Sequence, residues 1–176
     1  MKIKMIELKK ELKGRILDIG GGGEGVIGRL YRLQVTAIDN RQEELDEAPD
    51  CFEKLLMDAT QMTFADSSFD NVTLFYTLMF MKSPEQQKTL CEAARVLKPN
   101  GEIHIWDCNI ESAYPEPFCI EVDACLPDER IQTTYGIGKL DTQSADSIKA
   151  MCEFAGLRIE NVMIDGKHFF IKCRKV

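Results

Sequence analysis

The chain has 176 residues, a formal net charge of −7, a hydrophobic fraction of 44% and a charged fraction of 29%. These values are typical of one globular domain with a substantial core. The excess of acidic residues argues against a nucleic-acid partner, because binding to a phosphate backbone depends on clustered Lys and Arg. No stretch reaches the ~20 apolar residues that span a bilayer, so we expect no membrane partner.

The first 14 residues, MKIKMIELKKELKG, predict one short lysine-rich helix and lack the apolar core of a signal peptide. The chain has seven cysteines, with no C-x-x-C pair, and two histidines. These counts favour reduced, mostly buried thiols over a disulfide framework, and they give no basis for a structural zinc site. We therefore expect a cytoplasmic protein without a metal site.

Short apolar runs rich in branched residues alternate with helical patterns. The runs predict strands at residues 15–19, 34–38, 53–57, 70–76 and 102–107. The clearest helix begins at Ser83, the expected N-cap, with Pro84 in the first turn and Gln86 completing a capping box. A second helix is expected to begin at Ser144 and to end at Gly156.

The tail departs from this alternation. Two apolar runs, 157–164 and 167–176, flank the dipeptide Asp165-Gly166 and predict an antiparallel β-hairpin with a two-residue turn. Residues 109–142 form the one long connection without a firm helical pattern. The order of elements predicts an α/β fold: a Rossmann-like, doubly wound, mostly parallel sheet that ends in a C-terminal antiparallel hairpin, in a single domain.

Four consecutive glycines follow the first predicted strand and precede a helix that is expected to start near Val26. In an open α/β sheet this turn lies at the carboxyl ends of the strands, where ligands bind. Glycines let the backbone turn sharply and approach a ligand closely. The G-x-G-x-x-G spacing of Gly20, Gly22 and Gly25 is a weak signal alone, and a purely structural turn stays open as an alternative.

Acidic residues stand at the ends of three successive predicted strands. Asp39 can accept hydrogen bonds from the ribose hydroxyls of an adenosine, although it or Asn40 could instead cap the next helix. Asp58 can accept from the adenine amine, and the backbone N–H of Ala59 can donate to a ring nitrogen. Asp18, just before the glycines, would repel a pyrophosphate but attract a ligand that carries an ammonium and a sulfonium.

Five segments resemble, in order and spacing, the successive motifs of the class I S-adenosylmethionine-dependent methyltransferases: ILDIGGGGEG, AIDN, LLMDAT, FADSSFDNVTLFYTLMF and EAARVLKPNGEIHIWD. The resemblance is closest to the small-molecule type and covers residues 15–107. It implies S-adenosylmethionine as the cofactor and the following binding residues: Asp18, Gly20, Gly21, Gly22, Asp39, Asn40, Asp58, Ala59, Phe75 and Tyr76. The glycine loop is one residue longer than usual, and Met79 and Phe80 stand where many relatives carry histidine.

Methyl transfer is an in-line displacement in which holding donor and acceptor collinear supplies much of the acceleration. Where the acceptor must lose a proton, Asp107 at the end of the fifth strand is the expected base, with a structural cap or a solvated carboxylate as the alternative. Tyr76 is expected to orient the substrate or simply to pack. Residues 109–142 are expected to fold over the cofactor and recognise the substrate. Cys108, Cys119 and Cys125 leave thiol-assisted methylation of a metalloid as a minor alternative.

The sequence therefore predicts methyl transfer from S-adenosylmethionine to a nucleophile on a small-molecule acceptor. The predicted organisation is a short N-terminal helix (1–14), a cofactor-binding half (15–107), a substrate segment (109–142) and a C-terminal helix and hairpin (143–176). Two other classes stay open. One is a nicotinamide-dependent oxidoreductase, against which Asp18 and Asp58 argue, and the other is a non-catalytic cofactor-binding partner module. The sequence leaves the acceptor and the oligomeric state undefined.

Overall fold

A computed structural model describes residues 2–111, 118–138 and 141–176. The strands are β1 (Lys4–Glu7), β2 (Ile16–Ile19), β3 (Val35–Asp39), β4 (Glu53–Leu56), β5 (Phe69–Phe75), β6 (Leu97–Cys108), β7 (Phe118–Cys125), β8 (Arg130–Ile137), β9 (Leu157–Asp165) and β10 (His168–Lys175). The α-helices are α1 (Val26–Tyr31), α2 (Gln42–Glu47), α3 (Ser83–Val96) and α4 (Ala145–Phe154), and short 3-10 helices lie at Arg32–Gln34 and Leu78–Phe80.

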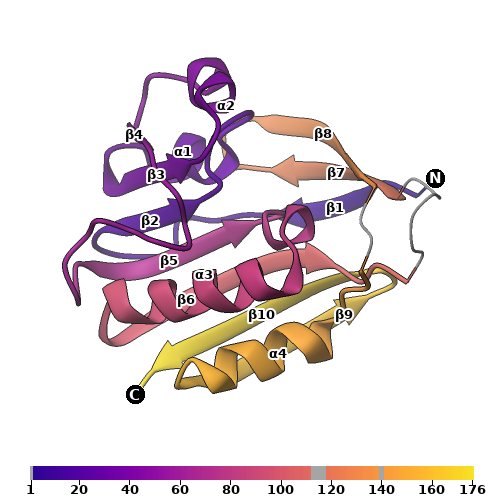
Figure 1. Cartoon of the computed structure of the whole chain (residues 1–176). Helices are drawn as coiled ribbons and strands as arrows, with labels where there is room; N and C mark the ends of the chain where they lie inside the picture. The colour runs from indigo at the N-terminus through magenta and orange to yellow at the C-terminus, as the bar shows by residue number, and fades with distance from the viewer. Residues whose placement is uncertain (1, 112–117, 139–140) are drawn as a thin grey trace.

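The main sheet has the strand order β4-β3-β2-β5-β6-β10-β9 (Figure 1). The strands from β4 to β6 run parallel, and β10 is antiparallel to both β6 and β9. The chain leaves β2 toward one edge of the sheet and leaves β5 toward the other. The carboxyl ends of β2 and β5 therefore form the switch point at which open α/β sheets bind ligands. The predicted doubly wound fold with its terminal hairpin is confirmed.

A second, three-stranded sheet has the order β1-β7-β8. The strand β1 pairs in parallel with β7, with Lys4 opposite Val122, and β7 pairs antiparallel with β8. The predicted N-terminal helix at 1–14 is therefore wrong. Ile6 and Leu8 are buried two residues apart, which is the period of a strand, and pairing with a distant segment overrides the local helical pattern.

The predicted cap of α3 is also wrong. Lys82 occupies the N-cap position, and no side chain caps the helix there. Ser83 instead donates its hydroxyl to Asp141 Oδ2 at 2.9 Å, and Gln86 donates through Nε2 to Gln143 Oε1 at 2.7 Å. Both side chains bond to the segment ahead of α4, so tertiary partners replace the local capping box.

The predictions for the C-terminal part are confirmed with one shift. Ser144 caps α4 in a capping box with Ser147, and Gly156 ends the helix with φ 85°. In the hairpin, Asp165 lies opposite His168, so Gly166 and Lys167 form the two-residue turn, one position later than predicted. Gly166 has φ 59°, which glycine adopts without strain.

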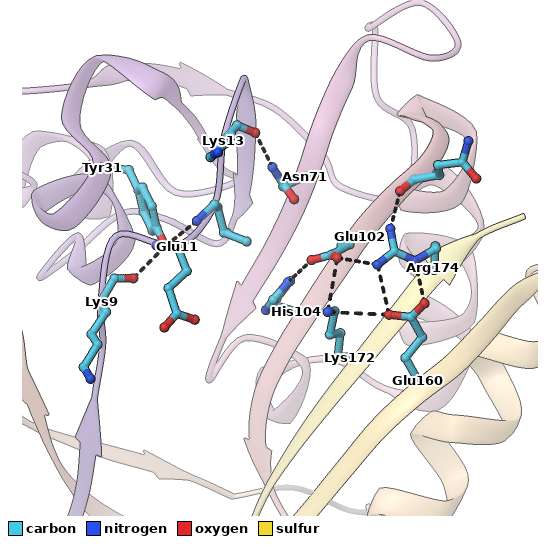
Figure 2. Close-up of polar contacts among 12 residues, drawn as sticks. Lys9, Glu11, Lys13, Tyr31, Asn71, Glu102, His104, Glu160, Lys172 and Arg174 are labelled. Carbon is cyan, nitrogen blue, oxygen red and sulfur yellow. Dashed lines mark hydrogen bonds and ion pairs between the residues drawn. The ribbon is translucent and has the colours of Figure 1, made fainter.

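Each face of the main sheet has a hydrophobic core. Alternate residues of β5, β6 and β10 pack beneath α3 and α4, and a second core joins β1, β7 and β8 to α1. On β6, β10 and β9, the residues that face away from α3 and α4 form a network of ion pairs (Figure 2). It contains Glu102, His104, Glu160, Lys172 and Arg174. In the described part of the chain, no helix is long and apolar enough to cross a membrane.

Candidate active site

A cleft of about 600 Å³ opens at the carboxyl ends of β2, β3, β4 and β5. Pockets that bind small molecules are typically ~300–1,000 Å³. Every residue that the sequence predicts as cofactor-binding lines this cleft: Asp18, Gly20, Gly21, Gly22, Asp39, Asn40, Asp58, Ala59, Phe75 and Tyr76. Parallel strands end at the same edge of a sheet, so motifs that are far apart along the chain converge here.

The glycine loop forms a floor without side chains. Gly20 has φ 72°, and its N–H donates to Ile38 O at 2.8 Å. A Cβ atom on Gly20 would lie 2.5 Å from the Thr77 side chain, and one on Gly21 would lie 2.5 Å from Asp18 Oδ2. The loop therefore requires glycine at both positions, because a side chain at either one would collide with residues packed against the loop.

Asp18 is a buried carboxyl group beneath this loop, with 3% of its surface exposed. Thr73 Oγ1 donates to Asp18 Oδ1 at 2.8 Å. Burial, with a smaller contribution from the charge of Asp39, raises the pKa of Asp18 from 3.8 to about 7, against the effect of the Thr73 hydrogen bond. A cation bound above the loop would therefore be stabilised by ionised Asp18 and would in turn favour its ionisation.

The other two strand-end acids accept hydrogen bonds from nearby backbone. Asp39 Oδ1 accepts from the Arg41 N–H at 3.1 Å. Arg41 occupies the N-cap position of α2, and no side chain caps the helix there, so neither Asp39 nor Asn40 is its cap. Asp58 Oδ1 accepts from Thr60 N and Oγ1 at 2.8 and 2.7 Å, and these bonds lower the pKa of Asp58. Asp58 is exposed and remains an ionised acceptor at the rim of the cleft.

Tyr76 follows β5 directly and is 2% exposed. It has φ 52°, an uncommon conformation for a bulky residue, and its N–H donates to Trp106 O at 2.8 Å. Its ring stacks on Tyr135 of β8, with the centroids 5.2 Å apart and the planes at 10°. Its hydroxyl lies 2.8 Å from His168 Nδ1, and burial raises its pKa.

Asp107 does not reach the cleft. It is 0% exposed, its Oδ1 accepts from Gln143 Nε2 at 2.7 Å and from Cys108 N at 2.9 Å, and its Oδ2 accepts from Met79 N at 3.2 Å. These bonds tie the end of β6 to neighbouring loops. The structure therefore does not support the predicted role of Asp107 as a general base, and it gives Asp107 the position of a buried structural acceptor.

The strand β8 lines one side of the cleft through Thr133, Thr134, Tyr135 and Gly136. Thr133 Oγ1 donates to Glu24 Oε1 at 2.6 Å, which joins β8 to the glycine loop. The expectation that residues 109–142 fold over the site is thus supported for β8, whereas residues 112–117 and 139–140 lie outside the described residues. Pairing with β7 brings β8 to the cleft, and no local motif marks it.

The cleft is strongly acidic. The acids that line it are Asp18, Glu24, Asp39, Glu44, Glu47, Asp58 and Glu85. Among the described residues, Arg41 is the single basic side chain that lines it, and Arg41 pairs with Glu44 at 3.2 Å. Such a surface favours cations and neutral molecules over anions. Sequence reasoning singled out three of these acids and missed Glu24, although it lies within the glycine motif.

A family model described as a methyltransferase domain matches residues 17–105. The chain is 31% identical over 159 residues to 27-O-demethylrifamycin SV methyltransferase of Amycolatopsis mediterranei, covering 84% of this chain and 55% of that protein. It is 33% identical over 103 residues to phosphatidylethanolamine N-methyltransferase of Cereibacter sphaeroides, covering 52% of this chain and 49% of that protein. The chain thus spans about half the length of these curated relatives.

The structure is also similar to a crystal structure of an S-adenosylmethionine-dependent methyltransferase from Methanosarcina mazei. The TM-score is 0.69 at 19% identity, over 97% of this chain and 99% of that chain. At this identity the likeness shows the fold, and the sequence match shows the family. The chain belongs to the methyltransferase domain family, within the class I S-adenosylmethionine-dependent methyltransferases.

Proposed function

We propose that this chain transfers a methyl group from S-adenosylmethionine to a nucleophile on a small-molecule acceptor. The observation that carries the proposal is the convergence of Asp18, Asp39 and Asp58 with a glycine floor at one switch-point cleft. The cleft has the size of a ligand pocket and an excess of carboxylates that suits a cationic cofactor. A side chain at Gly21 would collide with Asp18 and Ala37, so the loop can pass directly over the buried Asp18 carboxyl group only with glycine at this position.

Each residue is assigned to one portion of the cofactor. Asp39 accepts from the ribose hydroxyls, and Asp58 with the Ala59 N–H holds the adenine. Asp18 and the glycine loop hold the methionine portion, and Tyr76 faces the methyl group. When bound, S-adenosylmethionine supplies a methyl group that its sulfonium activates toward in-line displacement. The residues of the chain contribute by fixing donor and acceptor in line, which is worth several kcal/mol in comparable systems.

The acceptor is proposed to enter beside β8, where Tyr135 and Thr134 line the cleft. The name of the Amycolatopsis relative describes a small-molecule O-methyltransferase, which supports a small-molecule acceptor here. The acidic lining favours a neutral or cationic acceptor over an anionic one. We also propose a cytoplasmic location, because an odd number of cysteines without C-x-x-C spacing favours reduced thiols.

Isothermal titration calorimetry tests the cofactor. The chain is expected to bind S-adenosylmethionine and S-adenosylhomocysteine and to give no heat with NAD. Asp39→Ala is expected to weaken cofactor binding at least tenfold, whereas Asp128→Ala, an exposed residue outside the cleft, serves as the matched control. NAD binding without any response to S-adenosylmethionine would favour the oxidoreductase alternative and refute the proposal.

Formation of S-adenosylhomocysteine over a panel of small hydroxyl, amine and thiol acceptors tests turnover. Steady product formation with at least one acceptor is expected. Cofactor binding without turnover on any acceptor would favour the non-catalytic partner module.

A further inference from the structure

An acceptor hydroxyl must lose its proton as it is methylated, and the cleft itself offers no nitrogen base. No histidine lines it among the described residues, and Asp107 is buried away from it. His168 is the first residue of β10, next to the hairpin turn, and it lies one hydrogen bond behind Tyr76. Sequence reasoning gave neither histidine a catalytic role.

The contact between Tyr76 and His168 connects the cleft to the protein surface. Tyr76 lines the cleft and is almost fully buried, whereas His168 is half-buried. The Oη to Nδ1 distance is 2.8 Å, and the two rings meet edge to face with centroids 5.8 Å apart. The backbone of Tyr76 is held in its strained conformation by the bond to Trp106 O, which fixes the direction of the ring.

The wall beside Tyr76 is aromatic. Its ring stacks on Tyr135, and Tyr135 meets Phe80 edge to face at 6.3 Å. Phe80 is exposed and lines the cleft, so its ring is available to a planar ligand. Aromatic side chains of this kind favour a flat aromatic acceptor. The surrounding carboxylates disfavour an acceptor that is already ionised, so the acceptor enters neutral and loses its proton inside.

We propose that the acceptor is a neutral aromatic hydroxyl compound and that Tyr76 and His168 carry its proton to the surface. The inference rests on the proposed methyl transfer. Tyr76 touches the acceptor, and His168 is the residue that positions Tyr76 and receives its proton. In this arrangement His168 holds its own proton on Nε2, and Tyr76 Oη donates to Nδ1.

The step balances in atoms and charge. The acceptor oxygen forms a bond to the methyl carbon, the bond from that carbon to sulfur breaks, and its electron pair stays on sulfur. The acceptor proton passes to Tyr76 Oη as the proton of Tyr76 passes to His168 Nδ1. His168 then carries a positive charge, releases the proton on Nε2 to solvent, and regains the tautomer with its proton on Nε2 by proton exchange with solvent before the next turnover. No oxidant or metal is needed.

The surroundings of His168 keep it neutral and ready to accept a proton. Desolvation is the main cause that lowers the pKa of His168 below 6.5, and the charges of Lys4 on β1 and Lys167 in the turn act in the same direction. Asp165 on β9 opposes them. A base with a lowered pKa is unprotonated near neutral pH, and its contribution to the rate rises as pH rises through that pKa.

The test uses the full chain with S-adenosylmethionine and a series of substituted phenols as acceptors. His168→Gln and Tyr76→Phe are each expected to lower kcat at neutral pH at least ~100-fold, with little change in KM. The affinity for S-adenosylmethionine is expected to stay within about twofold for His168→Gln, because His168 does not line the cleft. The loss is expected to be small below the pKa of His168, where the base is already protonated, to be largest above it, and to shrink again at high pH as hydroxide replaces the base.

His104→Gln is the matched control, because the chain has two histidines and His104 lies on the sheet face that points away from α3 and α4, 2.9 Å from Glu102 Oε2 (Figure 2). This variant should keep the wild-type pH profile. It also leaves one histidine signal in an NMR titration, which reports the pKa of His168 directly. That value is expected to match the midpoint of the rise in kcat/KM.

Four results would overturn the inference. They are an unchanged pH profile in His168→Gln, an equal loss at every pH, a mismatch between the NMR and kinetic midpoints, and a failure to methylate any phenol while the cofactor binds. Each of these leaves the proposed cofactor intact. A failure of S-adenosylmethionine to bind the wild-type chain would instead refute the proposed function itself.

Discussion

Replacing Asp18 with Asn tests the reasoning about the buried carboxyl group. In the folded chain the pKa of Asp18 is raised from 3.8 to about 7, chiefly by burial, so ionisation of this group opposes folding. This shift sets the direction in which folding stability changes with pH. Folding is favoured most when Asp18 is protonated, below its unfolded pKa, and this advantage is lost as pH rises from 3.8 toward 7.

The magnitude follows from the same shift. A rise from 3.8 to about 7, at roughly 1.4 kcal/mol per pH unit, gives a change of about 4 kcal/mol in unfolding free energy between about pH 4 and pH 8. Asp18→Asn removes this titration and keeps an oxygen for the Thr73 hydroxyl. The unfolding free energy of the variant is therefore expected to increase relative to that of wild type as pH rises. The amide can add a difference of its own, but that difference does not depend on pH.

Urea unfolding of both proteins at several pH values measures the difference. Asp58→Asn is the control of opposite sign. Hydrogen bonds from Thr60 lower the pKa of Asp58, so the stability that Asp58 contributes is present above its unfolded pKa of 3.8 and is lost as pH falls. A stability difference between wild type and Asp18→Asn that does not change with pH would refute the account of Asp18.

Asp18→Asn is also expected to weaken cofactor binding. Calorimetry in two buffers with different ionisation enthalpies checks this loss. Wild type should release protons on binding S-adenosylmethionine near neutral pH, because the bound cation lowers the pKa of Asp18, and the variant should not.

Three further changes test other contacts in the structure. Gly21→Ala would put a methyl group 2.5 Å from a carboxylate oxygen, so we expect a loss of about 1–3 kcal/mol in a thermal melt together with weaker cofactor binding, and an unchanged melt would contradict this. Glu160→Gln removes a carboxylate whose pKa the Arg174 hydrogen bond lowers from 4.5 to about 2. The variant should therefore melt at a lower temperature than wild type at neutral pH, and this difference should disappear as pH falls from 4.5 toward 2. Tyr31→Phe removes a hydroxyl that donates to Lys9 O and accepts from the backbone N–H groups of Glu11 and Leu12 (Figure 2). The change should cost about 1–3 kcal/mol and speed amide exchange in that segment.

The parts of the fold that sequence reasoning predicted correctly are those set by local pattern. Each strand from β2 to β6 has its own apolar run and its own turn residues, and the acids at the ends of β2 and β3, with Asp58 just beyond β4, follow from the parallel arrangement. The Ser144 cap is correct because its partner, Ser147, lies within the same helix. Residues close together along the chain decide the strands, the turns and this cap.

The predictions that failed depend on contacts between segments that are far apart along the chain. The first strand forms because β7 lies beside it, and Ser83 and Gln86 find partners ahead of α4 in place of a local cap. Asp107 ends a strand, as expected, but Gln143 covers it from 36 residues away. Sequence patterns place a carboxylate near the edge of a sheet, whereas contacts between distant segments decide whether a ligand can reach it.

The parallel pairing of Lys4 with Val122 has a consequence for assembly of the protein. An emerging chain can build the central strands of the main sheet while its first strand still lacks a neighbour, because that neighbour is synthesised much later. The wall that β8 forms beside the cleft depends on β7, and β7 is flanked on its other side by β1. Completion of the ligand-binding wall is therefore expected to be a late and comparatively slow event in folding, governed by closure of a long loop.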